Sequence, residues 1–371
     1  KSLDLPLVVA GDDRLLNVGS GTEIIVDAKQ GNVFVAPSED IKRQYKELLQ
    51  SKETVAEEAE NISSETWTAD DTRVYLAANI NLCSDLPVAK RLKAEGVGLY
   101  RSEFPFIIRN NFPSEEEQLA VYQRILNEME DQKVIFRTLD IGGDKVVSYA
   151  PSLEGDNPFM GLRAIRFSLK NRDIFSQQLR ALLRAAADRS LYVMFPMISS
   201  VDDFKTSKDL LFRCQTELAQ EGVPYSEDIY TGLMVELPSA VTLIDVLVKE
   251  ADFLSIGSND LVQYLLAVDR TNQNTADFYN PFHPAVLRAL HRIVEAADLN
   301  KTPVSICGEI ATEPRMIPFL LGIGLRSFSI DPRLLPQVQR IISSLKIRDA
   351  EELAEKALSM ASEAEISEFF T

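Results

Sequence analysis

The sequence predicts an α/β protein in which a closed (β/α)8 barrel follows a small β segment and a linker helix. Eight apolar, strand-like runs lie between residues 73 and 331, and amphipathic segments separate them. Strands that are apolar along nearly their whole length are typical of a parallel sheet buried on both faces. Eight such repeats over about 300 residues favour closure into a barrel over an open sheet.

The chain is expected to have three parts. Residues 1–38 hold short β-type runs separated by glycine turns, and a piece of this size cannot bury a core of its own. We therefore expect it to be the remnant of a larger domain. Residues 39–64 are highly charged and contain no glycine or proline, which indicates a solvated linker helix. Residues 65–371 are expected to form the barrel.

Each barrel element has its own signal. Ser114 before three glutamates predicts a helix start, with the serine as N-cap and an acidic first turn. His283, directly before a proline, is also expected to begin a helix. The expected strands are 73–80, 97–100, 134–140, 191–198, 231–237, 252–258, 303–309 and 326–331.

The amino-acid composition excludes several classes of binding partner and site. The chain has 39 basic and 56 acidic residues, a net charge of −17, which disfavours nucleic acid and anionic membranes as partners. Three well-separated cysteines predict neither a disulfide framework nor a zinc site. No apolar run approaches ~18 residues and no signal peptide opens the chain, so we expect no membrane insertion and a cytoplasmic location.

Polar side chains follow five of the expected strands. In a barrel, chemistry gathers at the carboxyl ends of the strands, so these side chains should converge. An unpaired charge buried there would cost several kcal/mol, which makes five chance placements improbable. The polar groups are Arg101 to Glu103, Arg137, Glu236, Ser258 to Asp260, and Cys307 to Glu309.

These residue types suit a small anionic substrate. Planar guanidinium groups recognise phosphate and carboxylate. The Gly142-Gly143 turn would let backbone N–H groups approach an anion beside Lys145, although a plain tight turn explains it equally well. Glu236 and Asp260 could share one Mg²⁺, or each could pair with an arginine. The candidate guanidinium groups are those of Arg101, Arg137, Arg163 and Arg270.

Cys307 ends an apolar strand and allows two interpretations. A buried structural cysteine is the commoner case. Beside a metal and arginines, however, its thiol could act as a general acid that protonates an enolate carbon. Position alone favours neither.

Seven motifs together resemble the enzyme I family of the phosphoenolpyruvate (PEP)-dependent phosphotransferase system and, more broadly, the PEP-utilising enzymes. They occur in order and span essentially the whole chain. The motifs are GLYRSEF (98–104), RTLDIGGDK (137–145), NPFMGLRAIR (157–166), MVELPSA (234–240), SIGSNDLVQYLLAVDR (255–270), NPFHPAVLR (280–288) and CGEIATEP (307–314).

The resemblance implies a barrel that binds PEP and Mg²⁺ and releases pyruvate. It implies that Glu236 and Asp260 hold the metal and that Cys307 is the acid/base at the methylene carbon. It implies a catalytic role for Arg163 at the phosphoryl group. It implies substrate-binding roles for Arg101, Arg137, Lys145, Asn259 and Arg270.

The resemblance also implies partners. The phosphoryl group would pass to a histidine on a swivelling domain and then to a histidine-containing phosphocarrier protein, and the barrel would form a homodimer. No phosphohistidine motif occurs here, and neither His283 nor His291 can take its place. Residues 1–38 would be the remnant of the swivelling domain, without its histidine. Thr312 and Glu313 depart from the family pattern after Cys307.

Two other functions remain open. The first is a Mg²⁺-dependent lyase or aldolase that uses a pyruvate enolate, which would need fewer phosphate-facing arginines. The second is a non-catalytic dimerisation module that senses PEP.

Overall fold

The chain forms two compact units, Lys1–Asn61 and Ile62–Thr371, which are treated separately below. Most of the expected linker helix 39–64 and the substrate candidate Lys145 lie outside the described residues. The computed structural model describes residues 18–27, 32–37, 42, 59, 61–107, 111–130, 132–142, 158–272 and 274–370.

The first unit contains a β-hairpin. Strand β1 (Ile24–Asp27) pairs antiparallel with β2 (Asn32–Val35), and Ile25 lies opposite Phe34. The β-type runs expected around these residues are therefore confirmed. Their origin in a phosphohistidine domain stays a prediction.

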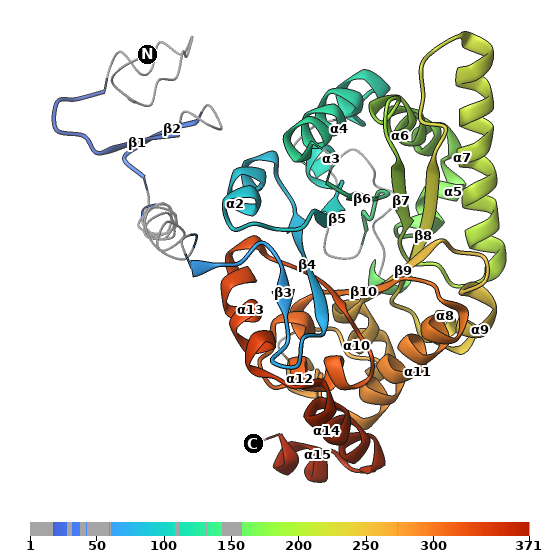
Figure 1. Cartoon of the computed structure of the whole chain (residues 1–371). Coiled ribbons are helices and arrows are strands. Elements are labelled where there is room, and N and C mark those ends of the chain that lie inside the picture. The colour runs from blue at the N-terminus through green and yellow to red at the C-terminus, as the bar shows by residue number, and fades with distance from the viewer. Residues whose placement is uncertain are drawn as a thin grey trace. The chain divides into compact units, whose positions relative to one another are not determined.

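The second unit is a closed parallel barrel, as predicted (Figure 1). Each of its eight strands pairs in parallel with the next, and the last pairs with the first, with Phe328 opposite Leu76. A short strand β3 (Thr66–Trp67) adds to it in the antiparallel direction. All eight expected strands are present. They are β4 (Arg73–Ile80), β5 (Val97–Arg101), β6 (Val134–Arg137), β7 (Leu191–Phe195), β8 (Ile229–Val235), β9 (Phe253–Gly257), β10 (Val304–Cys307) and β11 (Ser327–Ile330).

Helices lie around the outside of the barrel (Figure 1). Ser114 caps one of them through reciprocal hydrogen bonds with Glu117, as its sequence predicts. His283 caps another, because its Nδ1 accepts the N–H of Ala285 at 3.1 Å. The helices are α2 (Leu86–Arg91), α3 (Phe104–Ile107), α4 (Glu115–Met129), α5 (Ile165–Lys170), α6 (Arg172–Ala185), α7 (Val201–Glu221), α8 (Pro238–Thr242), α9 (Ile244–Leu247), α10 (Ser258–Leu266), α11 (Pro284–Asn300), α12 (Met316–Gly322), α13 (Leu335–Ser344), α14 (Ile347–Ser359) and α15 (Glu363–Phe369).

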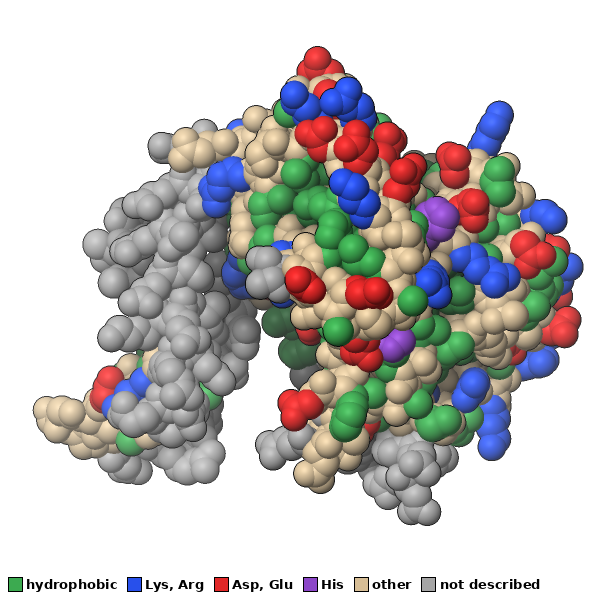
Figure 2. Space-filling view, turned by 90° about the horizontal axis from the view of Figure 1, so that it is seen from below, with side chains coloured by type: hydrophobic (Ala, Val, Ile, Leu, Met, Phe, Trp, Pro, Cys, Tyr) green, Lys and Arg blue, Asp and Glu red, His purple; other side chains and the backbone are tan. Residues whose placement is uncertain are grey.

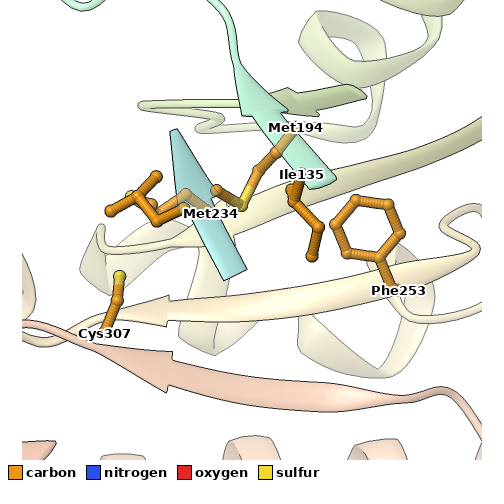
Figure 3. Close-up of a cluster of buried hydrophobic side chains, with 6 residues drawn as sticks. Ile135, Met194, Met234, Phe253 and Cys307 are labelled. Atoms are coloured by element: carbon orange, nitrogen blue, oxygen red, sulfur yellow. The ribbon is translucent and has the colours of Figure 1, made fainter. Parts of the chain in front are cut away.

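One buried cluster runs through the barrel interior (Figure 3). Phe253 begins β9 and Cys307 ends β10, so they lie at opposite ends of the cluster (Figure 3). This layer separates the two ends of the barrel. Its members are Leu99, Ile135, Met194, Met234, Phe253 and Cys307.

The surface agrees with the acidic composition. On the face drawn in Figure 2, basic and acidic side chains are interspersed and form no continuous basic patch. Across the described part of the chain, none of the helices has the length and apolar character needed to cross a bilayer.

Candidate active site

The candidate site lies at the carboxyl end of the barrel. Arg101 ends β5 and Arg137 ends β6, and the two occupy paired positions of these neighbouring strands. Glu236 follows β8, and Asp260 lies in the first turn of α10, directly after β9. These strands are neighbours too, with Val235 opposite Ile256. The barrel thus brings cationic and acidic predicted residues to one end.

Arg137 lies in a buried ion-pair network. Its guanidinium donates to Glu103, and its Nη2 lies 3.1 Å from Oδ2 of Asp140. Nη1 points at Sδ of Met234, 3.7 Å away. Only 4% of Arg137 is exposed, and within the described residues its buried Nε has no hydrogen-bond partner. Arg137 therefore already has two carboxylates against it.

Arg163 also forms ion pairs with two carboxylates. Its Nε donates to Oδ1 of Asp140 at 3.0 Å, so Asp140 bridges the two arginines. Its Nη2 and Nη1 donate to the two oxygens of Asp260 at 3.0 and 3.2 Å. Nη1 also donates to the hydroxyl of Tyr264 at 3.1 Å. Asp260 is thus held in a bidentate ion pair, the alternative that the sequence left open for it.

Glu236 is the acid whose surroundings are incomplete. Its Oε1 accepts the N–H of Met197 at 2.6 Å, but its buried Oε2 has no hydrogen-bond partner among the described residues. A Cβ added to Gly257 would lie 2.7 Å from that oxygen, so glycine leaves room for it. Burial, together with the nearby charges of Asp260 and Asp140, raises the pKa of Glu236 to about 8, and Arg137 and Arg163 oppose that rise.

This pKa predicts how stability depends on pH without metal. From about pH 4.5 to 8 the unfolded chain has lost this proton and the folded chain keeps it, so the folded state loses stability as pH rises. The slope is about 1.4 kcal/mol per pH unit, and no further loss follows above the folded pKa. Urea unfolding in EDTA should show this fall, and the Glu236→Gln variant should lack it. Parallel curves for the two proteins would contradict the assigned pKa.

The balance of charge suits a cation. Among the described residues of the site, four carboxyl groups (Glu103, Asp140, Glu236, Asp260) lie with three guanidinium groups, those of Arg101, Arg137 and Arg163. An orphaned carboxylate oxygen beside a second acid is a hard donor set that fits Mg²⁺. No group of three or more His, Cys, Asp or Glu side chains in the described part could hold a metal. The protein would thus offer two ligands, and substrate oxygens and water would supply the rest.

Arg101 differs from the other two arginines of the strand ends and loops. It is half-buried, and its buried Nε has no hydrogen-bond partner in the part of the chain that the structure describes. Within the described residues it forms no ion pair with a carboxylate, in contrast to Arg137 and Arg163. Its positive charge is therefore the one most available to an anionic ligand.

Cys307 lies beneath these charges. It is 3% exposed, and its Sγ lies 3.4 Å from the carbonyl oxygen of Ile256 and 3.8 Å from the hydroxyl of Ser255. Burial raises the pKa of the thiol, and Ser255, Arg101 and Arg137 oppose that rise. The thiol is thus protonated at neutral pH, as a proton donor must be, but the burial also suits a structural role.

Asn259 and Arg270 form an outer part of the site. Asn259 donates to Glu309 at 3.3 Å and accepts that residue's N–H at 2.9 Å, which ties the loops after β9 and β10 together. Tyr279 donates to the carbonyl of Asn259 at 3.4 Å. Burial and Glu309 raise the pKa of Tyr279 to about 12, and nearby Arg270 opposes this. Arg270 thus lies beside Tyr279, close to Asn259.

Three contributors had no role assigned to them from the sequence. Glu103 and Asp140 belong to the motifs quoted above, but only the structure shows that they neutralise arginines. Tyr264 lies one helical turn after Asp260 on α10, and that i, i+4 spacing could have indicated it. No sequence spacing links it to Arg163, which lies 101 positions away.

Comparison with known proteins identifies the family. Residues 55–347 match the family model described as PEP-utilising enzyme, PEP-binding domain. The chain belongs to this family. The match covers most of the barrel of this PEP-binding domain, including every described site residue above.

Curated relatives of this PEP-binding domain share one name. The phosphoenolpyruvate-protein phosphotransferase of Priestia megaterium is 42% identical over 370 residues, which is 100% of this chain and 65% of the relative. That of Staphylococcus carnosus (strain TM300) is 40% identical over 99% of this chain and 64% of the relative. The chain therefore spans slightly less than two thirds of these proteins.

A solved structure also resembles the barrel. A citrate lyase from Burkholderia xenovorans LB400 covers 82% of this chain and 91% of its own, at 14% identity and a TM-score of 0.46. A likeness this low has no bearing on the reaction.

Proposed function

We propose that this PEP-binding domain is the catalytic barrel of a cytoplasmic, Mg²⁺-dependent PEP-protein phosphotransferase. The phosphoryl group of PEP would pass to a histidine outside this chain, with release of pyruvate, and then to a histidine-containing phosphocarrier protein. The observation that carries the proposal is the orphaned Oε2 of Glu236, near Asp260, at the barrel end that also presents Arg101.

Each residue has a role in this proposal. Glu236 and Asp260 would hold Mg²⁺, which when bound would neutralise charge on the phosphoryl and carboxylate groups. Arg101 would bind the phosphoryl group as a planar fork, because, unlike Arg137 and Arg163, it has no carboxylate partner in the described residues. The Cys307 thiol would donate the proton to the enolate carbon.

Arg163 would change partners. It now bonds both oxygens of Asp260, and we expect a cation on this carboxylate to displace at least one of these bonds, because the cation and the guanidinium repel each other. Its bonds to Asp140 would keep it in place, and the released edge would be free for a phosphoryl oxygen. Asp260 would thus hold the Arg163 guanidinium until a cation binds, and Arg163 would then be able to bind a phosphoryl oxygen.

Neither histidine of the chain suits the acceptor role. Nδ1 of His283 accepts the Ala285 N–H, and its Nε2 lies 3.5 Å from Oε1 of Glu363. His291 lies inside α11. An acceptor elsewhere in the full-length protein agrees with the partial coverage of the relatives.

We also propose a homodimer through the barrel. Large apolar side chains on the loops after β5 and β6 and near Arg270 are exposed, which suits a protein partner. They include Phe104, Ile107, Met160 and Phe278, at 42, 42, 74 and 69% exposure.

The test measures PEP binding by calorimetry with Mg²⁺ and with EDTA. We expect binding only with Mg²⁺, and we expect Arg101→Met to weaken it on the order of 100-fold, about 2.7 kcal/mol. The matched control is Arg166→Met, which removes an exposed arginine that bonds only backbone carbonyls in the described part. Equal affinity in the Arg101 and Arg166 variants would refute the role of Arg101.

A second arm separates the other functions. Labelled PEP is mixed with this chain and a separate phosphohistidine domain. Label should appear on the added domain and not on this chain. Binding of PEP with no transfer would support the sensing module, and turnover of a hydroxyacid without PEP binding would support the lyase.

A further inference from the structure

A cavity lies at the amino end of the barrel, opposite the candidate active site. It has a volume of about 210 Å³. Its lining comes from the beginnings of β4, β5, β9, β10 and β11 and from Lys133, just before β6. Ile135 and Phe253 line it and also belong to the buried cluster of Figure 3, whose opposite end is Cys307. The cluster therefore separates the two sites.

Small side chains leave this end of the barrel hollow. Barrel interiors are commonly filled by bulky branched residues. Here Ala77, Gly98, Ser305 and Ser329 line the cavity. Gly98 cannot be replaced by a larger residue, because an added Cβ would lie 2.4 Å from Oγ of Ser329. Open space of this kind costs stability in proportion to its volume, so its retention calls for an explanation.

The mouth carries one cation without an acidic partner. Nζ of Lys133 lies 4.3 Å from the ring centroid of Tyr192 and 5.1 Å from that of Phe253. Lys133 forms no ion pair in the described residues, and burial alone lowers its pKa. The neighbouring acid, Glu95, is already paired with Arg73 and accepts a backbone N–H. Among the described residues of the lining, Lys133 is therefore the charge that has no partner of opposite sign.

We propose that this cavity binds a small aromatic monocarboxylate. Its ring would enter the apolar space beside Tyr75 and Phe253, and its carboxylate would pair with Lys133. A cavity of about 150 Å³ is large enough to bind benzene, so 210 Å³ accommodates a benzene ring with a short acidic arm. A dianion would find no second cation among the described residues that line the cavity.

The test uses phenylacetate with the full chain and measures affinity by calorimetry. The single tryptophan, Trp67, provides a second readout, because Arg73 lies over both its ring and that of Tyr75. Wild type should bind phenylacetate with a change in fluorescence. Lys133→Met should weaken phenylacetate at least tenfold and leave the affinity for neutral toluene unchanged. Ser305→Leu, which fills the cavity, should abolish binding of both.

Three results would overturn the proposal. They are no binding of phenylacetate at millimolar concentration, equal affinity in the Lys133→Met variant, and competition between phenylacetate and PEP. The last would place the ligand in the other site. Since Lys133 lies at the opposite end of the barrel, PEP binding serves as the control for folding of the variant.

Discussion

The Glu236→Gln variant will lose metal binding on the order of 100-fold, about 2.7 kcal/mol. Glutamine keeps the shape of the side chain and an oxygen for the Met197 N–H, but it removes the negative charge that would hold a cation. Among the described residues, two buried side-chain oxygens lack a hydrogen-bond partner. They are Oε2 of Glu236 and Oγ1 of Thr138, and only the first belongs to a carboxylate. Titration with Mn²⁺, followed by electron paramagnetic resonance, measures the loss directly.

Glu227→Gln is the matched control for this prediction. It makes the same chemical change at an exposed position outside the site. Metal affinity should be unchanged in the control. If both variants bind Mn²⁺ as the wild type does, the metal does not use Glu236, and the donor set argued above is wrong.

Arg137→Ala will destabilise the fold by about 3–5 kcal/mol. Its guanidinium neutralises Glu103 and Asp140, which are 3 and 1% exposed. Alanine removes this positive charge, so the two buried carboxylates lose their shared ion-pair partner. Urea unfolding at neutral pH measures the loss. The double variant Arg137→Ala/Glu103→Gln should recover part of it, because it removes one of the two buried charges.

This prediction changes how ligand binding can be tested. Weak PEP binding by the Arg137 variant would mix lost recognition with a disturbed network. Arg101 avoids that difficulty, since no ion pair in the described residues depends on it. A loss below about 1 kcal/mol in the Arg137 variant would show that the network contributes little to stability.

The sequence predicted the barrel because the information is local. Each strand is an apolar run, and Ser114 and His283 lie next to the helices that they cap. The position of the site followed from the polar residues at strand ends, since parallel strands end on one side. These inferences need no knowledge of distant contacts.

The pairing inside the site could not be predicted. Arg163 and Asp260 are 97 positions apart, and no spacing shows that they bind each other while Arg101 has no such partner. The amino-end cavity is hidden for a similar reason. Its small residues, such as Gly98 and Ser329, meet only once β5 and β11 are placed in the closed barrel.

The most direct test of the metal–PEP site is a crystal structure of this chain with Mn²⁺ and PEP, with the metal located by anomalous scattering. Our account predicts one metal ion in contact with Glu236 and Asp260, a phosphoryl oxygen on Arg101, and Arg163 detached from at least one oxygen of Asp260. A metal bound elsewhere, or PEP bound while both Arg163–Asp260 bonds remain and Glu236 Oε2 touches nothing, would contradict it.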